Sequence, residues 1–136
     1  TLPYTAYYNL RAEESDALLD GSPDADIAHP AAWEHRLMDS VSGCLFVPRR
    51  VFKDAGGFDS RFVGWGGEDR AFHACVAALS GPWARIEGPI VHLWHQRHGL
   101  DGNGNTWRWN QILEGRYLGA KTFDEMRAVR FGDAAS

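Results

Sequence analysis

The stretch at residues 56–72 constrains this chain more than any other part of it. Within seventeen residues it places five glycines, three phenylalanines, a tryptophan and the adjacent acids Glu68 and Asp69. Glycine loses more conformational freedom on folding than other residues, so such a stretch is favoured only where the backbone turns sharply or approaches another group closely. We therefore expect a turn of defined geometry. The simpler alternative is a well-packed turn whose acids only complement a helix N-terminus.

A helix is predicted directly after this stretch, over residues 67–80. Four apolar residues have the i, i+3, i+4, i+7 spacing of one helix face: Phe72, Cys75, Val76 and Leu79. Such spacing is typical of an amphipathic helix packed on a core. Glu68 and Asp69 would then occupy its first turn, where the helix dipole and unpaired N–H groups favour negative charge.

The rest of the pattern predicts a mixed α/β chain that leans towards α+β, with few strands flanked by helices. Further helices are expected over residues 11–20, 31–39, 48–55, 107–120 and 122–131. Strands are expected over residues 41–47, 83–87 and 90–94. Irregular or loop structure is expected over residues 2–10, 22–30 and 96–105.

Length and composition favour one domain spanning residues 1–136. A chain of 136 residues with 44% hydrophobic content can bury one core. We expect lead-in helices and a loop over residues 1–41, the motif core over 42–98, and a loop with terminal helices over 99–136. Cys44 and Cys75 each lie in an apolar run, which predicts reduced, buried thiols.

Charge and hydropathy exclude two classes of partner. The net charge of −4 gives no basic surface for a nucleic-acid backbone. No apolar run reaches the length of about 18 residues that a membrane span needs, and no signal peptide is recognisable at the N-terminus. A soluble, cytoplasmic protein is therefore expected. Thr1 stands where an initiator methionine would be, which is consistent with a preceding segment.

Three histidines lie where an apolar strand runs into a polar loop: His92, His95 and His98. In a strand, an offset of three puts His92 and His95 on opposite faces, so a ready-made three-histidine zinc site is not expected unless the backbone turns there. The arrangement instead favours a packed His92, a single metal ligand or acid–base group at His95 and a solvated His98.

Four of the six tryptophans lie near the candidate acids and histidines in the sequence: Trp65, Trp94, Trp107 and Trp109. Flat aromatic faces beside polar groups are surfaces on which sugar rings stack, although the same side chains also fill cores. The sequence leaves both roles open.

Residues 42–98 resemble the C-terminal, acceptor-side half of GT-A fold glycosyltransferases, most closely the galactosyltransferase and N-acetylgalactosaminyltransferase group. Three sequence features carry the resemblance: Gly56-Gly57-Phe58-Asp59, then Gly64-Trp65-Gly66-Gly67-Glu68-Asp69, and a histidine after a later apolar strand. The Trp-Gly-Gly-Glu-Asp core is the most specific of these. The resemblance implies an inverting transfer of a sugar from a nucleotide-sugar, expected to be a UDP-sugar, to a hydroxyl of a glycan or glycosylated acceptor.

The resemblance also implies roles for individual residues. Asp69 would be the catalytic base, which takes the proton of the acceptor hydroxyl as its oxygen attacks the anomeric carbon. The substrate-binding residues would be Asp59, Trp65, Gly66, Gly67, Glu68 and Trp94, with Glu68 binding the acceptor. A Mn²⁺ ion, or another divalent metal, would be held by His95, or less well by His92, and would neutralise the leaving diphosphate.

The family's nucleotide-binding half, with an Asp-x-Asp pair at a strand end, is not recognisable in these residues. Asp24-Ala25-Asp26 follows Gly-Ser-Pro in a polar loop and is not placed to substitute for that pair. The resemblance therefore implies further metal ligands from an N-terminal half, either in a longer chain or in a separate partner. The alternative function is a non-catalytic carbohydrate-binding or assembly module derived from the same fold.

Overall fold

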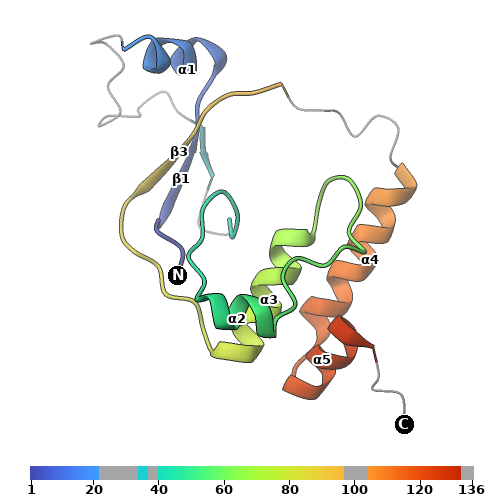
Figure 1. The fold of residues 1–136 in the computed structure, drawn as a ribbon. Coiled ribbons are helices and arrows are strands. Elements are labelled where there is room, and N and C mark those ends of the chain that lie inside the picture. The colour runs from blue at the N-terminus through green and yellow to red at the C-terminus, as the bar shows by residue number, and fades with distance from the viewer. Residues whose placement is uncertain (22–33, 37–39, 97–103, 133–136) are drawn as a thin grey trace. The chain divides into compact units, whose positions relative to one another are not determined.

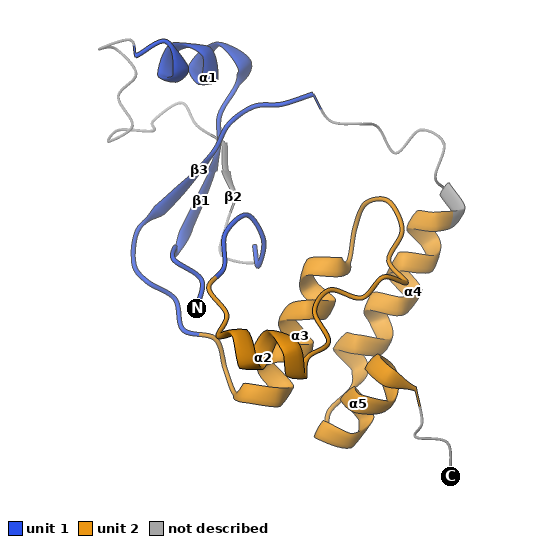
Figure 2. Ribbon diagram, viewed as in Figure 1, with its two compact units in different colours: residues 1–45, 84–97 blue, residues 46–83, 98–136 orange. Residues whose placement is uncertain are grey.

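The structure, a computed structural model, describes residues 1–21, 34–36, 40–96 and 104–132. It forms two compact units, Thr1–Leu45 with Ala84–Arg97 and Phe46–Trp83 with His98–Ser136 (Figure 2). Helices and strands are both present, in agreement with the predicted α/β class. Because compact units can belong to one domain, the single domain expected over residues 1–136 stays a prediction.

The first unit is built on a three-stranded sheet in the order β2-β1-β3 (Figure 1). The strands are β1 (Ala6–Asn9), β2 (Glu34–Arg36) and β3 (Pro89–His92). β1 pairs antiparallel with β2 and parallel with β3, so that Tyr8 lies opposite both His35 and Val91. This pairing brings together segments that are some eighty residues apart in the sequence, which local patterns do not reveal.

The expectations for this sheet were partly wrong. Residues 2–10 contain β1 rather than irregular structure, because Tyr7 and Tyr8 suit a paired strand. Residues 34–36 form β2 where a helix was predicted over 31–39. The strand predicted over 41–47 does not form. β1 already has a neighbour on each side, and Gly43 has a left-handed φ of 89° that interrupts an extended chain.

The remaining part of the first unit consists of α1 (Ala12–Leu19) and the segment around Ser40. α1 confirms the helix predicted over 11–20, and the Glu14 carboxylate accepts a hydrogen bond from the backbone of Arg11 at its start. The buried Tyr4 hydroxyl donates hydrogen bonds to backbone carbonyls of Ser40 and Ser42. Side chains therefore hold the 40–42 segment where strand pairing was predicted.

In the part that the structure describes, the regular elements of the second unit are all helices. It contains α2 (Arg49–Asp54), α3 (Glu68–Ser80), α4 (Gly104–Gly119) and α5 (Phe123–Phe131). These bounds confirm the four helices predicted in this region to within about three residues. α3 packs against α2, α4 and α5, so the helix that begins with the two acids is the centre of the unit.

The core of the second unit forms along the predicted apolar face of α3. Phe72 stacks on Phe58 at a centroid distance of 4.5 Å and contacts Phe52 at 5.7 Å. Cys75 and Val76 are also buried. Burial of Cys75 was expected and is confirmed, whereas Cys44 is only partly buried; both thiols are free. The α3 core therefore fixes the position of the turn that precedes this helix.

Candidate functional site: a left-handed turn before an acidic helix start

The glycine-rich stretch is a series of left-handed backbone positions. All five of its glycines have positive φ: Gly56 (74°), Gly57 (70°), Gly64 (75°), Gly66 (106°) and Gly67 (92°). Residues with a Cβ rarely adopt these values, so the glycines are needed for the chain path itself. The expected turn of defined geometry is confirmed. We call residues 63–67 the motif turn.

Gly67 combines a left-handed φ with a close approach to two side chains. A Cβ at this position would lie 3.1 Å from the Phe62 ring and 3.2 Å from the side chain of Glu114. Gly67 is also the N-cap residue of α3, so its backbone conformation sets the direction in which the helix leaves the turn. The motif turn is therefore packed tightly against α4.

The Gly67→Ala variant is expected to have a free energy of unfolding about 1–3 kcal/mol below that of the wild type. The reason is that the backbone of alanine would be strained at this φ and its Cβ would be crowded by Phe62 and Glu114. Gly115→Ala is a matched control, since Gly115 lies within α4 and an added Cβ would meet no atom within 4 Å. That variant should gain up to about 1 kcal/mol from helix propensity. Denaturant titrations of both variants check this, and equal shifts of the same sign would contradict it.

The two acids form the first turn of α3, as predicted. Oε2 of Glu68 accepts a hydrogen bond from the backbone N–H of Gly66 at 3.0 Å, which ties this carboxylate back to the motif turn. Asp69 is the second residue of the helix and is partly exposed. The helix N-terminus favours negative charge on both side chains. The structure thus presents two neighbouring carboxylates on a rigid element.

Trp65 projects from the motif turn with 70% of its surface exposed. Its backbone is held, since the carbonyl oxygen accepts a hydrogen bond from Nδ2 of Asn110 at 3.3 Å. Trp107 also lies beside the turn, with its indole 3.7–3.8 Å from the position of a Cβ on Gly66. Because both tryptophans are exposed, neither fills the core, and the alternative that they act as surface platforms is favoured.

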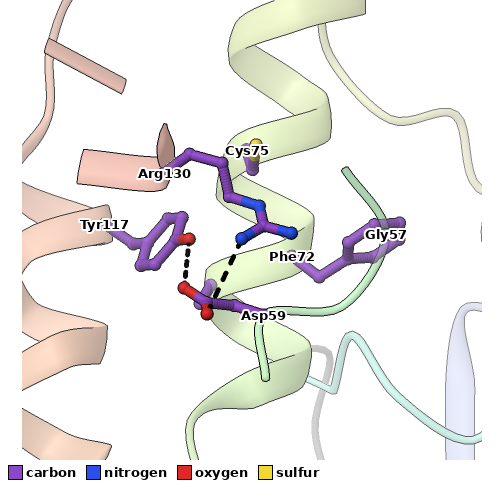
Figure 3. Close-up of a pocket in the computed structure, with 7 residues that line it drawn as sticks. Gly57, Asp59, Phe72, Cys75, Tyr117 and Arg130 are labelled. Atoms are coloured by element: carbon purple, nitrogen blue, oxygen red, sulfur yellow. Dashed lines mark hydrogen bonds and ion pairs between the residues drawn. The ribbon is translucent and has the colours of Figure 1, made fainter. Parts of the chain in front are cut away.

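Asp59 lies in a polar cluster that we define as the Asp59 cluster: Asp59, Arg61, Tyr117 and Arg130 (Figure 3 shows all but Arg61). Its carboxylate accepts hydrogen bonds from Arg61 Nη2 at 2.6 Å and from the Tyr117 hydroxyl at 2.7 Å. Arg130 Nη1 lies 3.6 Å away. The hollow lined by Asp59, Tyr117, Arg130 and Cys75 has no room even for a water-sized group. These contacts support a structural role, and acceptor binding by Asp59 stays a prediction.

The charges of this cluster are fixed by its hydrogen bonds. Burial alone would raise the pKa of Asp59, but hydrogen bonds from the side chain and backbone of Arg61 and from Tyr117 outweigh it and lower the pKa to about 2. Burial, followed by the bond to Asp59, raises the pKa of the Tyr117 hydroxyl. Asp59 therefore stays ionised and Tyr117 stays protonated at neutral pH.

His92 and His95 belong to the first unit and lie close together. The rings of His92 and His95 are 5.1 Å apart, edge to face, and His92 also stacks on Tyr7 at 5.7 Å. β3 ends at His92, so the strand alternation that would put these two side chains on opposite faces does not extend to His95. His92 is packed, as expected. His98 lies outside the described residues.

The described residues do not form a complete metal site. His95 is exposed, and its Nδ1 lies 3.2 Å from the carbonyl oxygen of Gln96. Nowhere in residues 1–21, 40–96 and 104–132 do three His, Cys, Asp or Glu side chains gather as metal ligands. Imidazole suits Mn²⁺, but this ion also prefers carboxylate oxygens. That His95 is a metal ligand stays a prediction.

Of the predicted site residues, the second unit contains Trp65, Gly66, Gly67, Glu68 and Asp69 as one continuous surface feature, with Asp59 in the cluster beside it. Trp94, His92 and His95 belong to the first unit. Trp94 is exposed, and its backbone N–H donates to Oγ of Ser15 at 2.7 Å. Asp24-Ala25-Asp26, which was discounted as a metal pair, lies outside the described residues.

Four residues that support this site were missed by reasoning from the sequence: Asn110, Glu114, Tyr117 and Arg130. All four lie on α4 or α5, more than forty residues after the motif turn. Asn110 and Glu114 are buried although both are polar, and a four-residue spacing places them on one helix face. That spacing was the one signal available in the sequence.

A turn that presents an exposed tryptophan and two carboxylates on a helix start defines a class of site suited to a polyhydroxylated ligand. Residues 27–99, which are more than half of the chain, match the family described as the N-terminal domain of galactosyltransferase. The chain therefore belongs to this family. No curated protein and no solved structure matches it.

The family match covers every residue predicted for the site, from Asp59 to His95, and supports the resemblance to galactosyltransferases. It ends before α4, so the residues of α4 and α5 that hold the motif turn and the Asp59 cluster lie outside it. No helix among the described residues has the length and apolar character needed to traverse a bilayer.

Proposed function

We propose that this chain provides the acceptor-binding side and the catalytic base of an inverting glycosyltransferase that uses a UDP-sugar. The observation that carries the proposal is the pair of Glu68 and Asp69, fixed at the start of α3 directly after a turn that exposes Trp65. Membership of the galactosyltransferase family supports the same conclusion. In GT-A terms, the matched residues would be the acceptor-side half of the fold.

In this proposal, Trp65 and the two acids Glu68 and Asp69 make different kinds of contact with the acceptor. An exposed indole offers an apolar face to the C–H groups of a sugar ring, while carboxylates accept hydrogen bonds from its hydroxyls. Glu68 is oriented by its bond to Gly66, so its carboxylate is available as a fixed acceptor beside Trp65. Gly66 has no Cβ to stand between the sugar and the backbone of the motif turn, which permits close approach of the sugar at this position.

Asp69 acts as the general base in this proposal. Its carboxylate takes the proton of the attacking acceptor hydroxyl, the new bond forms between that oxygen and the anomeric carbon, and the bond from this carbon to the diphosphate breaks. The electron pair leaves with UDP, and attack from the opposite side inverts the anomeric configuration. A divalent ion such as Mn²⁺, when bound, would neutralise charge on the leaving diphosphate.

His95 is the residue of this chain that would reach the metal. Its exposed imidazole is a suitable nitrogen ligand, and the neighbouring His92 ring limits its rotation. The described residues bring no three possible metal ligands together, so the remaining ligands would be diphosphate oxygens of the donor and carboxylates outside the described residues. A nucleotide-binding half with such carboxylates is part of the proposal.

Transfer is tested with the protein expressed from its natural gene, incubated with Mn²⁺, UDP-galactose or UDP-N-acetylgalactosamine, and a panel of mono- and disaccharides. Release of UDP should require both the acceptor and the metal, and NMR of the product should show an inverted anomeric configuration. Removal of the metal with EDTA should abolish turnover, and Mn²⁺ should restore it. Saccharide binding that is independent of metal and nucleotide, with no UDP release, would contradict the transferase and support a non-catalytic module.

A further inference from the structure

The motif turn is held by one buried side chain from α4. Asn110 is only 2% exposed, and its Oδ1 accepts a hydrogen bond from the N–H of Val63 at 3.2 Å. Its Nδ2 donates to the carbonyl oxygens of Val63 at 3.0 Å and Trp65 at 3.3 Å. Both the oxygen and the nitrogen of the Asn110 amide therefore form hydrogen bonds with the backbone of the motif turn.

These bonds replace the pairing that a loop lacks. Among the described residues, no backbone–backbone hydrogen bond holds Val63 or Trp65. A buried amide side chain without hydrogen-bond partners is costly, and backbone N–H and C=O groups also need partners. Each satisfies the other here, which makes the path of residues 63–65 depend on Asn110 more than on any other described side chain.

Two further residues on the same face of α4 contact the motif turn or the start of α3. Trp107 lies beside Gly66, and Glu114 lies against Gly67. The buried Glu114 carboxylate also forms an ion pair with Arg70 of α3 at 2.8 Å, although the angles of that contact do not make it a hydrogen bond. With Asn110 between them, these residues follow an i, i+3, i+7 spacing, so one face of α4 lies along the whole turn.

We propose that Asn110 is a positioning residue for the acceptor: it fixes the backbone of Trp65 so that the exposed indole and the first turn of α3 keep one relative geometry. The part of this inference that concerns the acceptor rests on the proposed function. The part that concerns the turn does not. Asn110 lies outside the residues that match the family, so neither part follows from that match.

The Asn110→Leu variant keeps the branching at Cγ and the number of side-chain heavy atoms, and it removes all three hydrogen bonds. Hydrogen exchange should show protection of the Val63 amide reduced about tenfold or more relative to amides in the middle of α3. The KM for the acceptor should rise about tenfold while the KM for the UDP-sugar stays unchanged. Unchanged protection of Val63 would overturn the inference.

Met126→Ala is the matched control. Met126 is equally buried, but it lies on α5 and makes no polar contact with the motif turn. This variant should lose global stability through its cavity while the exchange of Val63, relative to α3, and the KM for the acceptor stay as in the wild type. A rise in acceptor KM equal to that of Asn110→Leu would mean that general destabilisation, and not positioning, is responsible.

Asn110→Asp is a second variant if the first does not fold. It keeps an oxygen that accepts the hydrogen bond of the Val63 N–H but turns a carboxylate towards two carbonyl oxygens. The Val63 amide should therefore remain protected while the KM for the sugar acceptor still rises.

On the wild type, NMR should show slow exchange of the Asn110 amide protons and contacts from them to Val63 and Trp65; fast exchange would overturn the inference. If the wild type binds no saccharide but Asn110→Leu still loses protection of the Val63 amide, Asn110 positions the turn as inferred, and only the proposed function is rejected.

Discussion

Asp69→Asn is expected to lower kcat for sugar transfer by a factor of roughly 10²–10⁴, with little change in the KM of either substrate. The amide has almost the same shape as the carboxylate and can still accept a hydrogen bond from the acceptor hydroxyl, but it cannot take the proton during attack. Initial rates of UDP release at saturating donor and acceptor check this. Wild-type kcat in this variant would remove Asp69 from the role of base.

Asp124→Asn separates loss of the base from loss of a favourable charge at a helix start. Asp124 is the second residue of α5, as Asp69 is of α3, and it is exposed. Both substitutions remove the same interaction with a helix dipole, which is worth about 0.3–1 kcal/mol. Asp124→Asn should therefore lose similar stability while its kcat stays at the wild-type value. A comparable fall in kcat would indicate a general effect on folding.

Asp59→Asn is expected to lower the free energy of unfolding by about 2–4 kcal/mol at neutral pH. The Asp59 side chain is 6% exposed, and removal of its charge leaves the guanidinium groups of Arg61 and Arg130 without their common partner. Denaturant titration checks this. Asp54→Asn is the control, since Asp54 lies exposed at the end of α2 and should change stability by less than about 0.5 kcal/mol.

The loss in Asp59→Asn should depend on pH in one direction. The pKa of Asp59 is lowered from an ordinary value of 3.8 to about 2 in the folded chain, so the ionised carboxylate stabilises the fold above about pH 4. That contribution, about 2 kcal/mol from the shift, is lost as the pH falls from 4 through 2. The difference between wild type and variant should shrink over this interval, and a constant difference would contradict the assigned hydrogen bonds.

The helical part of the second unit could be predicted from the sequence because its signals are local. The apolar face of α3 and the glycines that bound it lie within a few residues of one another, and α5 begins with a capping box of Thr122 and Glu125. The sheet could not be predicted, because β1 owes its position to partners at residues 34–36 and 89–92. Strand pairing across such separations leaves no local pattern.

In the candidate site, too, features with a local sequence pattern were predicted and features that depend on distant residues were not. The acids and Trp65 were identified because one continuous motif carries them, and Glu68 and Asp69 begin the helix that spacing predicted. Asp59 belongs to that motif as well, but its partners Tyr117 and Arg130 come from distant helices, so its buried hydrogen-bonded state was not foreseeable. Neither was the dependence of the turn on Asn110, whose role arises only when α4 packs beside α3.

The guanidinium of Arg130 reaches back across the second unit to the beginning of the motif. Its Nε donates to the carbonyl oxygen of Ala55 at 2.8 Å and its Nη2 donates to that of Gly56 at 2.6 Å. A polypeptide shortened to residues 27–99, which match the family, would keep the whole motif. It would lose the hydrogen bonds that Arg130 and Asn110 donate to the backbone of the motif. The boundary of sequence similarity is therefore not the boundary of an autonomous folding unit, and the last two helices are part of the scaffold on which the motif depends.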